Sequence, residues 1–205
     1  MGKMIWNFWA KKYHGLRVQK YSLGPTREKV KHLITEICDG RDRCLLDIGC
    51  GIGELLCELE DIHHLRRFGM DFSPNMIQIS LAKNSEVTHY VMDVHDLDKI
   101  ERQFDLITCT HSLPYYSNQQ KCIKMMQEIL EKDGRAIIAF AMVNSWFDKL
   151  ALQFVKLTTG PAIYLKDEDF KEMIHGLFKI ESQEIIRLKP YMPTIMVYDL
   201  RKVDK

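Results

Sequence analysis

Short apolar runs alternate with longer amphipathic stretches over most of the chain, which is typical of an α/β domain. Runs with the length and composition of strands lie at 44–48, 67–70, 87–92, 104–108, 135–142, 178–187 and 194–203. The stretches between them predict helices at 25–38, 54–61, 74–83, 118–131 and 166–175, turns at 22–25 and 132–134, and a partly helical segment at 144–165. Seven strands with helices between them predict a doubly wound, Rossmann-like sheet.

Charge is distributed unevenly along the chain. The 205 residues hold 29 Lys and Arg against 28 Asp and Glu, a net charge of +1 that argues against a dedicated nucleic-acid binder. The first 27 residues, however, carry six basic side chains and no acidic one, so the rest of the chain is net acidic. Within this N-terminal arm, residues 4–20 have the spacing of a helix with aromatic and apolar side chains on one side.

The six cysteines show neither a C-x-x-C pair nor the Cys/His spacing of a zinc site. We therefore expect reduced thiols, no metal and a cytoplasmic protein. No apolar stretch is long enough to span a bilayer, and the N-terminus lacks the pattern of a secretory signal.

The glycine-rich loop after the first strand is the most informative segment. Residues 46–54 read Leu-Asp-Ile-Gly-Cys-Gly-Ile-Gly-Glu, a buried strand followed by three alternating glycines and the start of a helix. Glycine allows a sharp turn and close approach of the backbone to a ligand, and the helix N-terminus offers free amide groups. A dinucleotide fingerprint requires glycine where Glu54 stands, which disfavours a nicotinamide-dependent oxidoreductase. The carboxylate of Asp47 instead suits a ligand that bears an ammonium group.

Two further carboxylates follow the next two strands. Asp71 ends the second strand, where it can accept the hydroxyl groups of a ribose, and Asp93 follows the third strand, where it can accept from the exocyclic amine of adenine. Carboxyl ends of parallel strands meet at the switch point of such a sheet. A nucleoside with a cationic tail and no phosphate fits these groups, and S-adenosylmethionine is such a molecule.

Four motifs in order carry a family resemblance. They are the loop at 46–53, Gly-Met-Asp-Phe-Ser-Pro-Asn-Met at 69–76, Met-Asp-Val-His-Asp-Leu at 92–97, and Phe-Asp-Leu-Ile at 104–107. Together they make residues 40–140 resemble the class I S-adenosylmethionine-dependent methyltransferases. Within that family, the chain is most similar to the compact methyltransferases of ubiquinone and menaquinone biosynthesis. The resemblance implies a seven-stranded sheet whose last strand is antiparallel, with an N-terminal helical cover, and S-adenosylhomocysteine as the product formed from the cofactor.

The resemblance also implies roles for individual residues. It assigns the methionine part of the cofactor to Asp47 and to the loop residues Gly49, Cys50, Gly51 and Gly53. It assigns the ribose to Asp71, the adenine or ribose faces to Phe72 and Met76, and the adenine edge to Asp93 and Val94. Thr110 and His111 are expected to line the floor near the reactive methyl group.

Methyl transfer needs a general base only when the acceptor must lose a proton. The candidates are His111 and, on the N-terminal arm, Tyr13; the alternatives are an ordinary pocket-lining histidine and a packed helix aromatic. His63, His64 and His95 are interpreted as surface residues. The stretch 112–115, Ser-Leu-Pro-Tyr, departs from the amine-binding box of N-methyltransferases and is interpreted as a coincidence.

The acceptor must be inferred from the parts outside the core. We expect one domain over 1–205, with residues 1–25 as an arm or lid, 40–140 as the cofactor-binding core and 144–165 as a substrate cover. Both covers are rich in aromatic residues, which favours a small-molecule acceptor over nucleic acid. The alternatives are a methyltransferase acting on protein or RNA, and a non-catalytic binder of the cofactor. The basic arm also has the composition to contact an anionic acceptor or a membrane surface.

Overall fold

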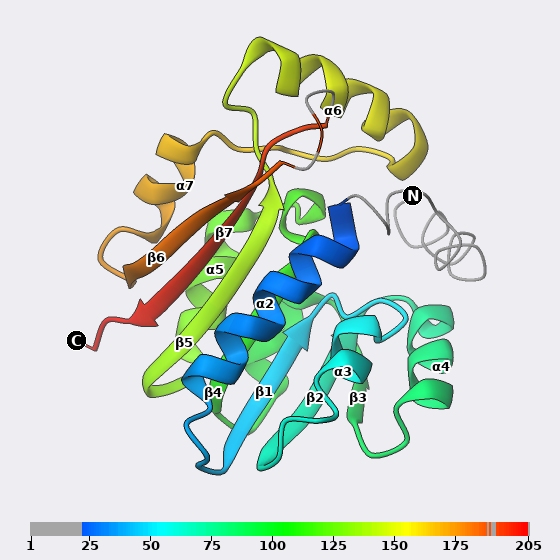
Figure 1. Cartoon of the computed structure of the whole chain (residues 1–205), viewed down its shortest axis with the longest axis vertical. Helices are drawn as coiled ribbons and strands as arrows, with labels where there is room; N and C mark the ends of the chain where they lie inside the picture. Colours follow the sequence, from blue (N-terminus) through cyan, green and yellow to red (C-terminus); the bar gives the residue numbers. More distant parts are fainter. Residues whose placement is uncertain (1–21, 188, 190–191, 205) are drawn as a thin grey trace.

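The computed structural model describes residues 22–187, 189 and 192–204, so the N-terminal arm before residue 22 lies outside the described residues. These residues form one seven-stranded sheet with the strand order β3-β2-β1-β4-β5-β7-β6 (Figure 1). The strands are β1 (Arg43–Ile48), β2 (Leu65–Asp71), β3 (Thr88–Val91), β4 (Phe104–Thr110), β5 (Leu130–Ala141), β6 (Phe178–Ile186) and β7 (Ile195–Lys202). The helices are α2 (Gly24–Ile37), α3 (Glu54–Glu58), α4 (Pro74–Lys83), α5 (Gln119–Glu128), α6 (Trp146–Thr159) and α7 (Asp167–Ile174), with 3₁₀ helices η3 (Val94–Lys99) and η4 (Leu113–Tyr115).

The sheet topology confirms the predicted fold class. Strands β1 to β5 pair in parallel, and the last strand of the chain, β7, runs antiparallel to both of its neighbours. The order reverses between β1 and β4, where the register places Asp47 beside Thr108. Ligands of doubly wound sheets bind in the crevice at the carboxyl ends of the strands, at this kind of reversal.

Both faces of the sheet are buried. Successive residues of β1 point to opposite faces, so Leu46 and Ile48 join one apolar cluster and Leu45 joins the other. Helices α2 and α3 cover the face that includes Leu45, and α5 and α7 cover the opposite face; Figure 1 shows α2 in front of the sheet and α5 behind it. This double cover explains why the parallel strands read as continuous apolar runs.

The predicted turn at 22–25 is wrong, because the chain is already helical there. Residues 22 and 23 form a π-helical turn, α2 begins at Gly24, and the Thr26 hydroxyl donates to the Ser22 carbonyl over 2.8 Å. Pro25 is compatible with this geometry because its missing N–H falls in the first turn of the helix, where no intrahelical partner exists.

The predicted turn at 132–134 is absorbed into a strand. β5 starts at Leu130 and continues through Asp133, which adopts a φ of 59° beside a register shift between Phe104 and Leu106. The preceding helix α5 therefore ends at Glu128, three residues earlier than expected, because the Ile129 carbonyl already accepts a bond from the Phe104 amide. A strand irregularity of this kind leaves no periodic signal in the sequence.

The segment at 144–165 contains the regular helix α6. Ser145 caps its N-terminus by accepting a bond of 3.1 Å from the Asp148 amide, and Gly160 ends it with a φ of 88°. In the part of the chain that the structure describes, no helix is both long and apolar enough to cross a membrane.

Candidate active site

The glycine loop makes a tight left-handed path between β1 and α3. Gly49, Gly51 and Gly53 have φ values of 76°, 54° and 74°, which strain any residue with a Cβ. A Cβ on Gly49 would lie 2.5 Å from that of Ser112, and one on Gly53 would lie 2.0 Å from the Ser80 hydroxyl oxygen. A Cβ on Gly51 would meet no atom within 4 Å, so space on that side of the loop is left for a ligand.

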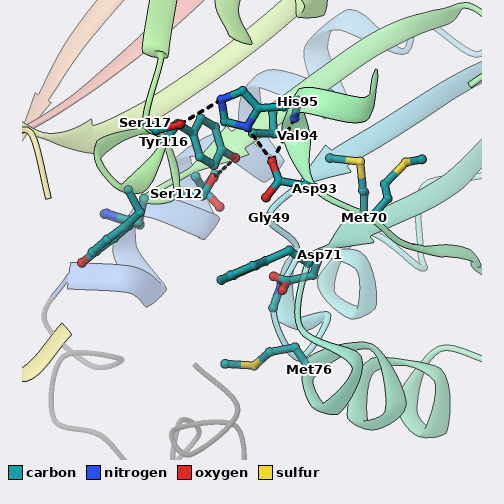
Figure 2. A pocket seen from close by; sticks show the side chains of 16 residues that line it. Gly49, Met70, Asp71, Met76, Asp93, Val94, His95, Ser112, Tyr116 and Ser117 are labelled. Carbon is teal, nitrogen blue, oxygen red and sulfur yellow. Dashed lines mark hydrogen bonds and ion pairs between the residues drawn. The ribbon is translucent and has the colours of Figure 1, made fainter. Parts of the chain in front are cut away.

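Two adjoining cavities share the glycine loop. The larger of these two, about 240 Å³ and hereafter the larger cavity, lies at the carboxyl ends of the strands (Figure 2). Most of the residues assigned to the cofactor from the sequence line it. They are Gly49, Gly51, Asp71, Phe72, Met76, Asp93, Val94 and Thr110, joined by His111. Residues not predicted from the sequence complete its lining: Met70, Met92, His95, Ser112, Tyr115, Tyr116 and Ser117.

Asp71 is held in place by backbone amides from two elements. One carboxylate oxygen accepts a bond of 3.0 Å from Gly51, and the other accepts 2.8 Å from Ser73. Burial nevertheless raises the pKa of Asp71 to about 6, because these two donors do not replace the water that an ionised carboxylate loses. Asp71 is therefore a fixed acceptor whose negative charge a suitable ligand would stabilise.

Asp47 lies in a second, smaller cavity of about 50 Å³ that shares Gly49, Gly51, Thr110 and His111 with the larger one. Its side chain is buried and accepts a bond of 2.8 Å from the Thr108 hydroxyl. Burial raises the pKa of Asp47 to about 7, and the nearby Asp71 adds to this shift. Cys50 also lines the smaller cavity, whereas Gly53 packs against Ser80 and Asn84, outside both sets of lining residues.

Arg27 was counted in the sequence only as part of the basic arm, but it also lines the smaller cavity. It projects from α2 and forms ion pairs with Glu54 at 3.2 Å and Glu58 at 2.8 Å. The smaller cavity thus presents a cationic side chain together with the acidic Asp47. No sequence motif joins α2 to the glycine loop, so only the fold reveals this pairing.

His95, interpreted from the sequence as a surface residue, is 30% exposed at its side chain and also lines the larger cavity. Its ring lies against the larger cavity, where Nδ1 contacts the Asp93 carboxylate at 2.6 Å and Nε2 lies 3.2 Å from the Ser117 hydroxyl (Figure 2). Asp93 also caps η3 by accepting a bond of 3.0 Å from the His95 amide. The cap places both side chains at the edge of the cavity, because η3 starts directly after β3.

His111 lies between the two cavities and lines both. It has a φ of 61°, and among the described residues its buried Nε2 finds no hydrogen-bond partner. Burial, with a smaller contribution from the positive charge of Arg27, lowers the pKa of His111 to about 4. The ring is therefore neutral at physiological pH, with an unpaired nitrogen beside the cavity floor.

The stretch 112–115, interpreted from the sequence as coincidental, belongs to the wall of the site. The Ser112 hydroxyl donates to the Ile48 carbonyl at 3.0 Å and accepts from the Tyr116 hydroxyl at 2.8 Å. These bonds tie the segment after β4 to the end of β1. The position of the stretch directly after the fourth strand was the signal that could have placed it here.

The other catalytic candidate, Tyr13, lies outside the described residues. Within the described part of the chain, no three His, Cys, Asp or Glu side chains gather as ligands of a metal ion. The six cysteines are free thiols.

Residues 46–138 match a family model described as a methyltransferase domain. Two curated proteins are similar: a demethylmenaquinone methyltransferase from Thermotoga maritima, 27% identical over 113 residues, and sterol 4-C-methyltransferase strm-1 from Caenorhabditis elegans, 28% identical over 115 residues. The alignments cover 55% and 51% of this chain but only 48% and 33% of those proteins, so the chain spans half or less of their length.

Among solved structures, the fold is similar to that of the N-methyltransferase NodS from Bradyrhizobium japonicum WM9, crystallised with S-adenosylhomocysteine. The TM-score is 0.73 at 15% identity, over 92% of this chain and 91% of the other.

Proposed function

We propose that this chain, which belongs to the class I S-adenosylmethionine-dependent methyltransferases, transfers the methyl group of S-adenosylmethionine to a small-molecule acceptor by in-line displacement. One observation carries the proposal. Asp47 and Asp71 are buried carboxylates with raised pKa values beside the glycine loop, and they lie next to a cavity with apolar walls. A ligand with a cationic tail and ribose hydroxyl groups satisfies both carboxylates at once.

The residues present fit the cofactor part by part. Asp71 would accept the ribose hydroxyl groups, and Phe72, Met76 and Val94 would pack against the base. Asp93 would accept from the adenine amine, with His95 holding its carboxylate in place. These groups all line the larger cavity.

The smaller cavity would take the methionine end. The amino group would be surrounded by Asp47, the segment 49–51 and Thr110. Gly53 would act indirectly, by allowing the loop to pack closely against Ser80 and Asn84. We add Arg27, which lines the same cavity and offers a cation to the methionine carboxylate. Glu54 also lines this cavity and pairs with Arg27 at 3.2 Å. We assign the amino group of the zwitterionic methionine end to Asp47 and its carboxylate to Arg27.

When bound, the cofactor supplies a methyl group already activated by its sulfonium. The chain's task is then to orient the acceptor and exclude water, so no catalytic triad is required. The pKa of about 4 makes the neutral ring of His111 a weak base, so we assign its unpaired Nε2 to orienting an acceptor hydroxyl or amine by a hydrogen bond at the floor of the site. Tyr13 remains a second candidate for contact with the acceptor.

A small molecule is the acceptor that we favour. The similar proteins named for menaquinone and sterol methylation support this class. We further propose one domain, with residues 1–25 as a lid, 40–140 as the cofactor-binding core and 144–165 as a cover for the acceptor. The free thiols fit a reducing compartment, and we place the protein in the cytoplasm.

Calorimetric titration with S-adenosylmethionine measures whether the chain binds this cofactor. Incubation with S-adenosylmethionine that carries a labelled methyl group and with a metabolite extract shows which class of molecule becomes methylated. Asp71→Asn should bind S-adenosylmethionine much more weakly than wild type, whereas Asp204→Asn, an exposed change after β7, should not. Binding that survives Asp71→Asn unchanged would contradict the assignment. If the chain binds the cofactor but labels protein or RNA and no small molecule, the acceptor is a macromolecule. If it binds the cofactor and labels nothing, the chain is a non-catalytic binder of S-adenosylmethionine.

A further inference from the structure

Helix α6 presents an apolar face to solvent. Four large side chains at spacings of four, four and three residues point outward: Trp146, Leu150, Phe154 and Leu157, with exposed fractions of 78%, 49%, 65% and 81%. At 100° per residue these positions fall within one quarter of the helix circumference. An apolar stripe of this size on one helix marks an interaction surface rather than scattered exposure.

The borders of this face are basic. Lys149 is exposed next to it on one side, and the Arg187 guanidinium lies 5.6 Å from the ring centroid of Phe147 on the other. Asp148, the one acidic residue of α6, points inward and is fully buried, accepting a bond of 2.9 Å from the Thr194 amide. The outward face of α6 therefore combines apolar side chains with positive charge and carries no carboxylate of its own helix.

The segment that follows α6 packs beside the stretch 113–115, whose Tyr115 lines the larger cavity. Following α6, the Ile163 amide donates to the Pro114 carbonyl at 2.7 Å, and Gln119 donates to the Ile163 carbonyl at 2.8 Å. The Ile163 side chain remains 57% exposed. Figure 1 shows α6 beyond the carboxyl end of β5, at the edge of the sheet where the parallel strands end.

We propose that this face of α6 docks on an anionic phospholipid membrane and holds the mouth of the larger cavity against it. An apolar helical face with basic borders is the composition that inserts into the boundary between headgroups and acyl chains. If the proposed function holds, on which this step rests, the acceptor is an apolar molecule that enters from the bilayer.

Two other partners could cover this face of α6: the N-terminal residues of the same chain, and a second copy of the protein. Charge disfavours both. Residues 1–21 carry five basic side chains and no acidic one, so they would bring positive charge to a positive border. A second copy would bring the same basic borders to the interface from both sides. An anionic surface is the partner whose charge is complementary.

Flotation with vesicles tests the docking without any assay of activity. We expect the full chain to float with vesicles of phosphatidylcholine and phosphatidylglycerol, weakly with phosphatidylcholine alone, and less at high salt. Leu157→Glu should lower the partition coefficient about tenfold or more, since it removes an inserted apolar group and adds a repelled charge. Leu81→Glu on α4 is the control, because Leu81 is an exposed leucine (48%) away from this face, and this variant should float like wild type. Leu150→Glu on α6 matches it in exposure, at 49%, and should lose flotation as Leu157→Glu does.

Three results would overturn the proposal: no flotation of the wild-type chain, equal flotation of Leu157→Glu, or loss of flotation only when Lys11 and Lys12 of the arm are replaced by serine. Self-association abolished by Leu157→Glu without vesicle binding would assign the face to a second copy instead. Calorimetry with S-adenosylmethionine separates this test from the proposed function, because Leu157→Glu should bind the cofactor like wild type.

Discussion

The Thr108 hydroxyl donates a hydrogen bond of 2.8 Å to the Asp47 carboxylate across the two strands between which the sheet order reverses. This bond stabilises the ionised carboxylate, and burial opposes it more strongly, so the pKa of Asp47 lies at about 7. Whether Asp47 is ionised at neutral pH therefore depends on two opposing effects: burial, which raises its pKa, and the hydrogen bond from Thr108, which lowers it.

Replacing Thr108 by valine should weaken cofactor binding at neutral pH. Loss of the bond raises the pKa of Asp47 further, and a rise of about one unit leaves roughly a fifth as much ionised carboxylate at pH 7, hence about fivefold weaker binding. Calorimetric titrations between about pH 6 and pH 9 should show the affinity rising with pH, with the midpoint displaced upward in the variant. Thr108→Ser keeps the hydroxyl and should follow wild type; identical profiles for serine and valine would contradict this account.

Asp47→Asn should make the protein without ligand more stable while abolishing cofactor binding. Because the pKa is raised on folding, the folded chain takes up a proton between about pH 4 and pH 7, so wild-type stability falls as the pH rises through that range. The amide avoids this loss, a gain of up to about 4 kcal/mol at pH 8 and almost none at pH 4. Urea unfolding at the two pH values measures the difference, and equal stability of both proteins at pH 8 would mean that Asp47 is not desolvated.

Much of the site could be predicted from the sequence because it follows from chain order. Strand ends in a parallel sheet meet at one edge, so Asp47, Asp71 and Asp93 could be placed once their strands were recognised. Arg27 could not, since α2 reaches the site through packing of elements far apart in the chain. The pairing of His95 with Asp93 was missed because it depends on the cap of a short 3₁₀ helix, which has no periodic signal.

Alanine substitutions at Gly51 and Gly53 should differ in what they impair: cofactor affinity at Gly51 and stability at Gly53. Both positions have positive φ, so each substitution costs about 1 kcal/mol of backbone strain. Gly53→Ala also drives its Cβ into the side chains of Ser80 and Asn84, so it should lower the thermal midpoint clearly more. Gly51→Ala meets no atom and should instead mainly lower cofactor affinity, because its Cβ occupies space open to the ligand. Equal loss of stability in the two variants would show that the loop relaxes around Ser80.

The ring of His111 should stay neutral far below the usual range for histidine. Burial lowers its pKa to about 4, so its ring proton signals should not titrate between about pH 5 and pH 8. His111→Asn identifies the signal by its disappearance, and asparagine tolerates the φ of 61° at this position. Since the pKa is lowered on folding, unfolding takes up a proton below about pH 6.5, and His111 contributes to loss of stability as the pH falls toward 4. A His111 signal that titrates near 6.5 would mean that water reaches Nε2 and that the ring is not desolvated.

Once an acceptor is identified, His111→Asn tests a role of this ring in the methyl-transfer step. Because His111 lines both cavities, the variant should be measured for kcat and for S-adenosylmethionine affinity. A fall in kcat that exceeds the fall in affinity is the expected result, and an equal fall in both would assign His111 to cofactor binding alone.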